Sequence, residues 1–255
     1  MRCRKARFLV PVLLAVLAAG ASSAGARDVE LPSETFRDWR FYNDAGWRCY
    51  LRGDYPRAEE RFNEAIRVLK PYEASQTRLL GRSYLNLALA LVEEGRVAEA
   101  EPLAKWALAV REWDPKVKDA AIVQNLDVLV RIDIAQRRYD AAKPLLERLL
   151  SLQERQAPPN PFEVASTLDR LAALELARGD FTVSEWYYRR ALALAEKDLP
   201  PDHIALAEVL EHYAALLRQR NRGPEAERLE ERAETVRAAA AKNPAPLSPS
   251  RTPRT

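Results

Sequence analysis

Apolar and small side chains recur at helical spacing along most of the chain, and five turn sites interrupt them at intervals of 42 residues. The segments that begin at these sites share one order of residue types: GDYPRAE, GRVAEAE, RRYDAAK, GDFTVSE and NRGPEAE. Each segment reads as a helix end, a reversal and a new helix start. The fixed interval predicts one helix-turn-helix unit repeated five times, with turns at Gly53, Gly95, Arg137, Gly179 and Asn221.

The turn residues themselves support this assignment. A residue that leaves a helix C-terminus often adopts a left-handed conformation, which glycine takes without steric cost and asparagine tolerates. Three of the five sites are glycine and one is asparagine. Arg137 is the exception to the expected residue type.

Small side chains are predicted where the two helices of a repeat cross, because only small side chains let two helices approach closely. A small or apolar pair precedes each turn, and two further positions after the turn carry alanine in most repeats. The pairs are Ala45-Gly46, Leu87-Ala88, Leu129-Val130, Leu171-Ala172 and Tyr213-Ala214, and the later positions are Ala58, Ala100, Ala142, Ser184 and Ala226, then Ala65, Ala107, Leu149, Ala191 and Ala233.

These positions resemble the tetratricopeptide repeat (TPR) pattern. The first repeat carries it as Tyr42, Ala45-Gly46, Ala58, Phe62 and Ala65. The interval exceeds the common period of roughly 34 residues, and the longer form is similar to the kinesin-light-chain type. The resemblance covers residues 38–241 and implies an all-α fold, an α-solenoid of about five helix pairs in a right-handed superhelix. The fifth repeat has Glu230 at a usually apolar position, which suits a terminal cap whose outer face meets water.

The ends of the chain do not follow the repeat. Residues 1–26 combine a basic start, an apolar run over residues 8–19 and a small-x-small site at Ala24-Gly25-Ala26, the pattern of a cleaved secretory signal peptide. An uncleaved membrane anchor is the alternative, although the run is shorter than the roughly 20 residues of a membrane span. Residues 27–37 are a lead-in, and residues 242–255, rich in proline, serine and arginine, are predicted to be disordered.

Removal of the signal peptide would change the charge balance, because its four basic residues account for the apparent basicity. The remainder has 36 basic and 37 acidic residues. Neither a nucleic-acid stripe nor a polybasic membrane patch stands out. The proline-rich end keeps a small basic excess that could touch an acidic surface, with a solvated end as the plainer interpretation.

The chain offers little for catalysis or metal binding. Cys49 would be the only cysteine after signal cleavage; it suits a small buried hydrophobe, and an intermolecular disulfide is the alternative. His203 and His212 lack metal-ligand spacing. His203 fits a structural place at a helix start, where Asp202 is available to cap. With no phosphate loop or nucleophile elbow either, we expect no enzymatic activity, no metal and no cofactor.

The resemblance implies that the first helix of each repeat lines the concave groove. The positions of that helix that are not small packing residues are therefore candidates for binding a peptide. The set is aromatic and basic at its N-terminal end and acidic at its C-terminal end, as an extended peptide with oppositely charged ends would require. The candidates are Arg40, Asn43, Trp47, Tyr50, Arg82, Leu85, Asn86, Leu89, Gln124, Asp127, Arg131, Asp169, Arg170, Glu211 and His212.

The sequence therefore predicts a non-catalytic interaction module or assembly adaptor, exported to the periplasm, that binds a protein or peptide in its groove. The alternative is a structural homo-oligomer, or a subunit of an envelope complex, assembled through the second helices or the chain ends. Anchoring to the inner membrane by the uncleaved leader is the alternative location. No nucleic-acid partner is expected.

Overall fold

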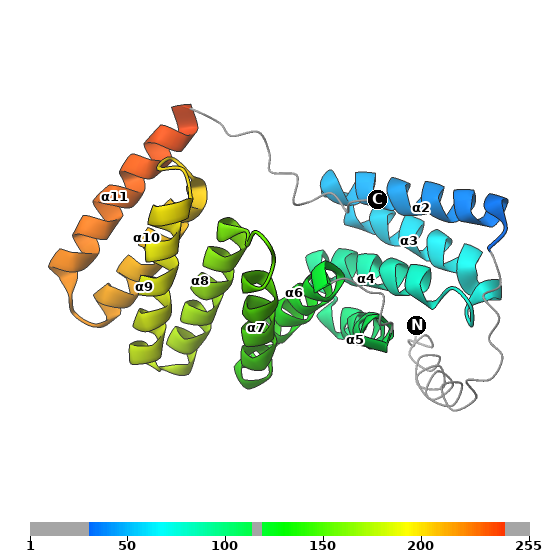
Figure 1. The fold of residues 1–255 in the computed structure, drawn as a ribbon, viewed down its shortest axis with the longest axis horizontal. Helices are drawn as coiled ribbons and strands as arrows, with labels where there is room; N and C mark the ends of the chain where they lie inside the picture. Colours follow the sequence, from blue (N-terminus) through cyan, green and yellow to red (C-terminus); the bar gives the residue numbers. More distant parts are fainter. Residues whose placement is uncertain (1–30, 114–118, 243–255) are drawn as a thin grey trace, which may run out of the picture. The chain divides into compact units, whose positions relative to one another are not determined.

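The computed structural model describes residues 31–113 and 119–242, in which all regular structure is helical. Two helices flank each predicted turn (Figure 1). They are α2 (Ser33–Leu51), α3 (Tyr55–Leu69), α4 (Thr77–Glu93), α5 (Val97–Trp113), α6 (Asp119–Ala135), α7 (Tyr139–Glu154), α8 (Pro161–Arg178), α9 (Phe181–Asp198), α10 (Ile204–Gln219) and α11 (Gly223–Lys242), with a short 3-10 helix, η1 (Lys70–Tyr72), after α3.

The helices extend slightly beyond the predicted repeat region, residues 38–241, at both ends. Helix α2 begins at Ser33, so part of the predicted lead-in belongs to the first helix. Helix α11 continues to Lys242. The predicted signal peptide and all but the first residue of the predicted tail lie outside the described residues, so both stay predictions.

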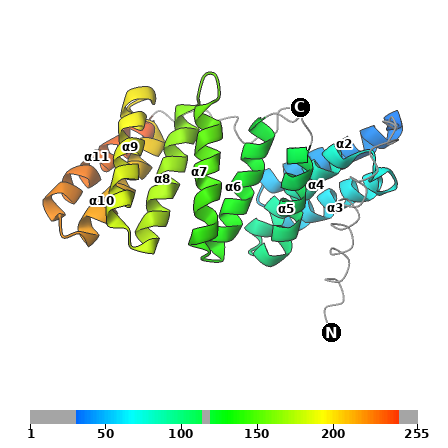
Figure 2. The ribbon, with the colours of Figure 1, turned by 60° about the horizontal axis from the view of Figure 1, so that its bottom comes forward.

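The chain divides into two compact units, Met1–Arg138 and Tyr139–Thr255. In the N-terminal unit each described helix from α2 to α6 packs against the next, and α4 also contacts α2 and α6 (Figures 1 and 2). In the C-terminal unit each helix from α7 to α11 packs against the next, and α8 also contacts α10. Within each unit the first helices of neighbouring repeats therefore touch. We call them the first-helix layers: α2, α4 and α6 in one unit, α8 and α10 in the other.

All five predicted turns adopt one backbone geometry. The glycines, Arg137 and Asn221 have positive φ, from 56° at Arg137 to 83° at Gly179. In every turn the following residue donates its N–H to the carbonyl five residues earlier, as Asp54 does to Cys49 at 3.0 Å. This pairing is a Schellman motif, which supplies partners for the last carbonyls of the helix. Arg137, the exception in residue type, adopts the same left-handed backbone conformation as the other four turn residues.

Replacing Arg137 with glycine is expected to stabilise the protein by about 1 kcal/mol, because glycine takes a positive φ without a side-chain clash. Arg137 is exposed, so the change removes little packing. Urea unfolding measures the difference. Arg137→Ala is the control, since it keeps a side chain at the strained position and should change stability little. Equal stability of the glycine and alanine variants would contradict the explanation.

The small residues lie where the two helices of a repeat meet. Ala58, Ala100 and Ala226 are fully buried, as are Ala65, Ala107 and Ala191. Ser184 takes the alanine position of the fourth repeat and, also fully buried, donates its hydroxyl to the Ala172 carbonyl at 2.7 Å. In the fifth repeat Glu230 is partly exposed and pairs with Arg218 of α10 at 2.6 Å, so its charge lies at the surface.

Side chains cap several helix starts. Asp180 accepts from the Val183 N–H at 3.0 Å, and Asn160 accepts from Phe162 at 3.1 Å, as expected for N-cap residues. The start of α10 differs from the prediction, because His203 and not Asp202 is the N-cap. The Nδ1 atom of His203 accepts from the Ala205 N–H at 3.1 Å. This contact confirms a structural place for His203.

Candidate functional site

A chain of polar contacts crosses the first-helix layer of the N-terminal unit. Tyr50 of α2 donates its hydroxyl to Glu93 of α4 at 2.8 Å, and Arg131 of α6 donates to the same Glu93 oxygen at 2.6 Å. All three side chains are half-buried. Burial, with the Glu93 charge adding to it, raises the pKa of Tyr50 to about 12. These contacts link three repeats, so Tyr50 and Arg131 hold the layer together in addition to any contact with a partner.

Asn43 and Asn86 form a second link between repeats. They are 1% and 4% exposed, and Asn86 donates its amide to the Asn43 oxygen at 2.7 Å. Leu85 is 2% exposed. We predicted that Asn43, Leu85 and Asn86 face a groove. This placement is wrong, because all three side chains are buried between helices. A helical period separates buried from exposed positions only when the neighbouring helix is known.

In the C-terminal unit, the repeat positions that correspond to Asn43 and Asn86 hold the ionisable residues Asp169 and His212. Asp169 of α8 faces His212 of α10, with both carboxylate oxygens 2.9 Å from Nδ1. His212 is exposed, and the hydrogen bond to Asp169 raises its pKa while burial opposes the shift. Glu208 and Glu211, on the same helix as His212, raise the pKa further. A predicted binding pair is therefore also an inter-repeat contact.

This pair is expected to make stability depend on pH. The folded-state pKa of His212 is raised, so its contribution is fully present below the unfolded value of about 6.5 and is lost as the pH rises through the folded value. Wild type should exceed His212→Gln in stability at about pH 5, by less than about 1 kcal/mol because the pair is exposed, and should match it at about pH 9. Urea unfolding at both pH values measures the difference. A gap that is constant with pH would contradict the assignment, and Asp169→Asn should remove the pH dependence in the same way.

The remaining predicted groove residues lie at or near the surface. Arg40 is exposed and forms an ion pair with Asp44 at 3.7 Å, and Glu211 pairs with Arg237 of α11 at 2.5 Å. Trp47 is half-buried and makes edge contacts with Tyr50 and Phe62. Gln124 is exposed, whereas Leu89, Asp127 and Arg170 are half-buried. Their role in binding stays a prediction.

Arg82 stands apart among the predicted residues. Its guanidinium lies 5.7 Å from the centre of the Trp39 ring, a cation–π arrangement. Trp39 is 3% exposed and held in place by a hydrogen bond from its indole nitrogen to Ser83 at 2.9 Å. Burial lowers the pKa of Arg82. Among the described residues, no carboxylate lies within ion-pair distance of Arg82, although the charge of nearby Asp44 opposes the lowering of its pKa.

Sequence reasoning missed a second arginine beside it. Arg111, near the end of α5, is 7% exposed and donates through Nη1 to the Ala121 carbonyl and to the Asn125 side chain, the latter at 2.6 Å. Asn125 is fully buried. Burial, with the Arg82 charge adding to it, lowers the pKa of Arg111 to about 10. No signal in the sequence marks Arg111, because it lies on a second helix.

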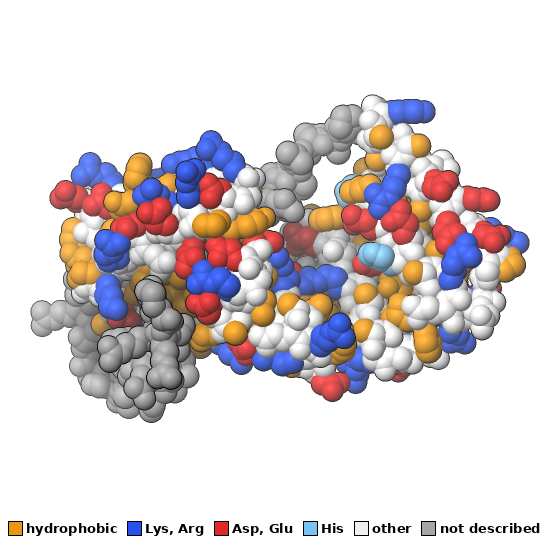
Figure 3. Space-filling view, turned by 180° about the vertical axis from the view of Figure 1, so that it is seen from behind, with side chains coloured by type: hydrophobic (Ala, Val, Ile, Leu, Met, Phe, Trp, Pro, Cys, Tyr) orange, Lys and Arg blue, Asp and Glu red, His pale blue; other side chains and the backbone are white. Residues whose placement is uncertain are grey.

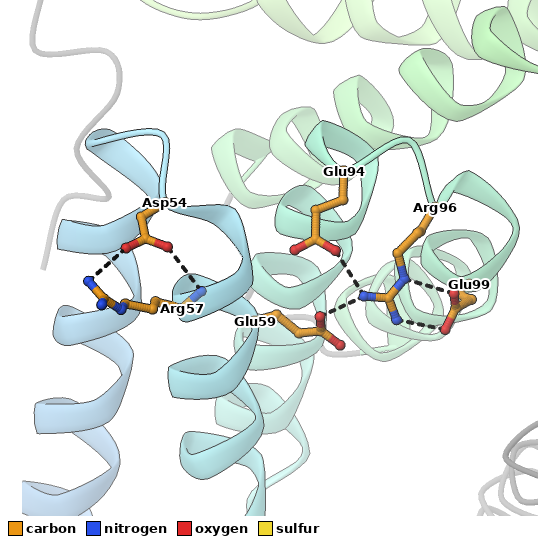
Figure 4. Close-up of polar contacts among 6 residues, drawn as sticks. All are labelled: Asp54, Arg57, Glu59, Glu94, Arg96 and Glu99. Atoms are coloured by element: carbon orange, nitrogen blue, oxygen red, sulfur yellow. Dashed lines mark hydrogen bonds and ion pairs between the residues drawn. The ribbon is translucent and has the colours of Figure 1, made fainter.

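Ion pairs recur at the turns within each unit, and sequence reasoning missed them as well. Arg96, directly after the second turn, contacts Glu59 of the preceding repeat at 2.6 Å, Glu94 at 2.9 Å and Glu99 at 2.8 Å (Figure 4). The hydrogen bonds to Glu99, Glu59 and Glu94 raise the pKa of Arg96. One arginine thus joins two repeats and neutralises several carboxylates.

The same register repeats at other turns. Arg138 bonds to Glu101 of the preceding repeat at 3.1 Å, and Arg222 bonds to Glu185 at 2.7 Å. At the fourth turn the position holds Asp180, the N-cap of α9. The signal was present in the sequence, as an arginine after the turn and a glutamate in the preceding repeat. We name these contacts the turn-edge row, and assign them a structural role.

Figure 3 shows both signs of charge on the face that it draws. Acidic and basic side chains are intermixed over the face of each unit that Figure 3 draws. Among the described residues no group of three or more His, Cys, Asp or Glu could hold a metal ion. Cys49 is half-buried and its thiol is free. Within the described part of the chain, no helix has the length and apolar character of a membrane span.

Comparisons with known proteins agree with this architecture. A crystal structure of a putative kinesin light chain with nearly identical TPR-like repeats, from Podosopora anserina, has a TM-score of 0.69 and 18% identity, covering 84% of this chain and 100% of that one. BtubC (BKLC) from P. vanneervenii has a TM-score of 0.67 and 19% identity, covering 88% and 93%. The apo form of RapI has a TM-score of 0.70 and 12% identity, covering 80% and 72%.

At these identities the likeness establishes the fold alone. None of the curated proteins matches the chain. The sequence model of the tetratricopeptide repeat family matches residues 49–112 and 163–239, more than half of the chain. The protein therefore belongs to the tetratricopeptide repeat family.

Proposed function

We propose that this protein is a non-catalytic adaptor that binds an acidic segment of a partner protein on the first-helix layer of its N-terminal unit. Membership of the repeat family supports a protein-binding role in general. The observation that carries the finer proposal is Arg82. Its guanidinium is half-buried over Trp39 and has no carboxylate partner among the described residues, whereas Arg96, Arg131 and Arg138 are each paired within the chain.

The physical reason is the cost of desolvating an unpaired charge. A partly buried guanidinium with no carboxylate in direct contact is unfavourable, and an incoming carboxylate would offset that cost with charge-assisted hydrogen bonds. The aromatic face of Trp39 holds the guanidinium in position before the partner arrives, which lowers the entropy lost on binding. Arg131, by contrast, is tied to Glu93, so its substitution would disturb the fold as well as binding.

We expect immobilised wild-type protein to retain a specific partner from a periplasmic extract and Arg82→Glu to lose at least about tenfold in retention. Arg228→Glu is the matched control: this exposed arginine lies on α11 and should leave retention unchanged. Quantitative mass spectrometry of the retained proteins, with circular dichroism of each variant, measures the effect. Equal retention by wild type and Arg82→Glu would refute this binding site.

Export to the periplasm is part of the proposal and rests on residues 1–26. The expected result is a mature chain that begins at Arg27 in the periplasmic fraction, read by intact mass. Recovery of the full-length chain in the membrane fraction would favour the uncleaved anchor. Self-assembly is the alternative function, and light scattering over a wide concentration range separates the two, because a constant monomer mass excludes a homo-oligomer.

A further inference from the structure

Helix α2 exposes a face that is buried on the first helix of every other repeat. Phe41 is 62% exposed, and Arg48 on the same face is also exposed. The residues that correspond to Phe41 in the later repeats are at most 2% exposed; they are Ser83, Asn125, Thr167 and Val209. Those that correspond to Arg48 are at most 3% exposed; they are Ala90, Ile132, Leu174 and Leu216.

The difference follows from the position of α2 in the stack. In the later repeats the first helix packs against the second helix of the preceding repeat: α4 on α3, α6 on α5, α8 on α7 and α10 on α9. Asn125, for example, donates to the Ala104 carbonyl of α5 at 3.3 Å, and Thr167 donates to Gln153 of α7 at 2.7 Å. Helix α2 packs against α3 and α4, and no described helix precedes it (Figure 1).

Six side chains form a stripe along this face. They alternate in spacing between four and three residues, which keeps them on one side of a helix. From the start of α2 to its end the stripe is acidic, then apolar, then basic: Glu34, Asp38, Phe41, Ala45, Arg48 and Arg52. Ala45 is half-buried and the other five are exposed. Among the described residues, none of the four charged side chains of the stripe forms an ion pair.

This order is complementary to itself when two helices run in opposite directions. An antiparallel second copy of the stripe would place Phe41 against Ala45, a large side chain against a small one. It would also place Asp38 against Arg48 and Glu34 against Arg52, and two-fold symmetry makes each pairing occur twice. A parallel second copy would instead bring like charges together, which opposes association.

We propose that two copies of this protein form a dimer through the stripe, in which each α2 takes the place that a preceding second helix has in the other repeats. Ahead of α2, only residues 27–30 would remain outside the described chain after the predicted signal cleavage, too few for such a helix. A two-fold contact closes after two copies, so this dimer differs from an extended structural oligomer. Trp39 and Arg82 lie outside the stripe, so the inference goes beyond the proposed function and does not depend on it.

The mass in solution tests the dimer directly. One helix from each copy makes a small interface, so we expect a dissociation constant on the order of 10–100 μM. Light scattering of the exported protein should show a mass that rises with concentration from one copy to two and no further. A monomer mass up to about 1 mM would overturn the proposal, including the case in which another part of the chain covers the stripe.

Charge reversal tests the antiparallel pairing. Asp38→Arg and Arg48→Glu each place like charges opposite one another, so each should raise the dissociation constant by at least about tenfold. An equimolar mixture of the two variants should form a heterodimer with about wild-type affinity, because the facing charges are then opposite at both ends. Asp38 and Arg48 are ten residues apart on one helix, so no contact within one chain produces this recovery. A mixture that stays monomeric, with both variants folded by circular dichroism, would refute the pairing.

Two matched variants separate the stripe from other surfaces. Phe41→Ser should abolish the dimer, whereas Trp186→Ser, which removes an aromatic side chain of α9 that is 55% exposed, should dimerise as wild type does. Equal dimerisation of these two variants would rule out the stripe. Arg82→Glu should also dimerise as wild type does while losing partner retention, so failure of the dimer and failure of the proposed binding site are distinguishable.

Discussion

Replacing Gly46 with alanine is expected to destabilise the protein by about 2 kcal/mol, within the range for overpacking a core. A Cβ added at Gly46 would lie 2.5 Å from Cε1 and 2.6 Å from Cδ1 of Phe62. Phe62 is fully buried, and Trp47 packs against its ring, so the ring has little room to move away. Alanine is favoured over glycine within a helix by about 1 kcal/mol, and the clash must exceed that gain.

The matched control is Gly81→Ala, in the interior of α4. A Cβ there would meet Cγ1 of Val110 at 3.6 Å, an ordinary van der Waals contact. Helix propensity then acts without a clash, so this variant should be more stable than wild type by up to about 1 kcal/mol. Both substitutions replace glycine with alanine, but the expected changes in stability have opposite signs. A general effect of losing a glycine could not produce that difference.

Urea unfolding followed by circular dichroism measures both variants. Because stacked repeats can unfold separately, hydrogen exchange should locate the loss of protection in α2 and α3. If Gly46→Ala proves as stable as wild type, Phe62 can move aside and the close crossing of α2 and α3 is not essential.

The comparison of Gly46 with Gly81 also shows what the sequence could predict. The interval between turns predicted all five left-handed residues, because a Schellman turn constrains the backbone directly. The alanine positions were predictable for a similar reason, since only a small side chain fits where two helices cross. Gly46 belonged to that pattern, but nothing in the sequence gave the distance to Phe62.

The candidate site was harder to predict because polar residues serve two purposes on a first helix. Asn43 and Asn86 are residue types that often bind peptides, yet here their side chains form a hydrogen bond with each other between α2 and α4. Arg82 was correctly placed on the first-helix layer, and its role in binding stays a prediction. Arg111 could not be recognised from the sequence as a buried arginine. It lacks a carboxylate partner among the described residues, and only the packing of α4, α5 and α6 reveals this.

Replacing Arg96 with glutamine is expected to destabilise the protein by about 1–2 kcal/mol, less than for a fully buried ion pair because the Arg96 side chain is 36% exposed. The main cost falls on Glu94. Its side chain is 16% exposed, one carboxylate oxygen is buried without a hydrogen-bond partner, and the other accepts from Arg96. Without Arg96 this carboxylate keeps its burial and loses the ion pair.

Arg57→Gln is the control for losing an arginine near a turn. Arg57 pairs with Asp54 at 3.1 Å, but its side chain is 76% exposed (Figure 4). Exposed pairs contribute little, so stability should change by less than about 0.5 kcal/mol. Urea unfolding at low and high salt compares the two variants. Equal losses for Arg57→Gln and Arg96→Gln would show that partial burial adds nothing at this turn.

A double-mutant cycle then tests whether Arg96 joins repeats or only stabilises its own helix. The Arg96–Glu59 pair links the second repeat to the first, whereas Glu99 lies three residues after Arg96 in the same repeat. The cycle of Arg96→Gln with Glu59→Gln should give a coupling of about 1 kcal/mol, within the range for contacting residues. The cycle with Glu99→Gln should give about 0.3–0.5 kcal/mol, as local helix pairs do. A larger coupling to Glu99 than to Glu59 would mean that the turn-edge row stabilises individual helices, and that the apolar interface alone holds neighbouring repeats together.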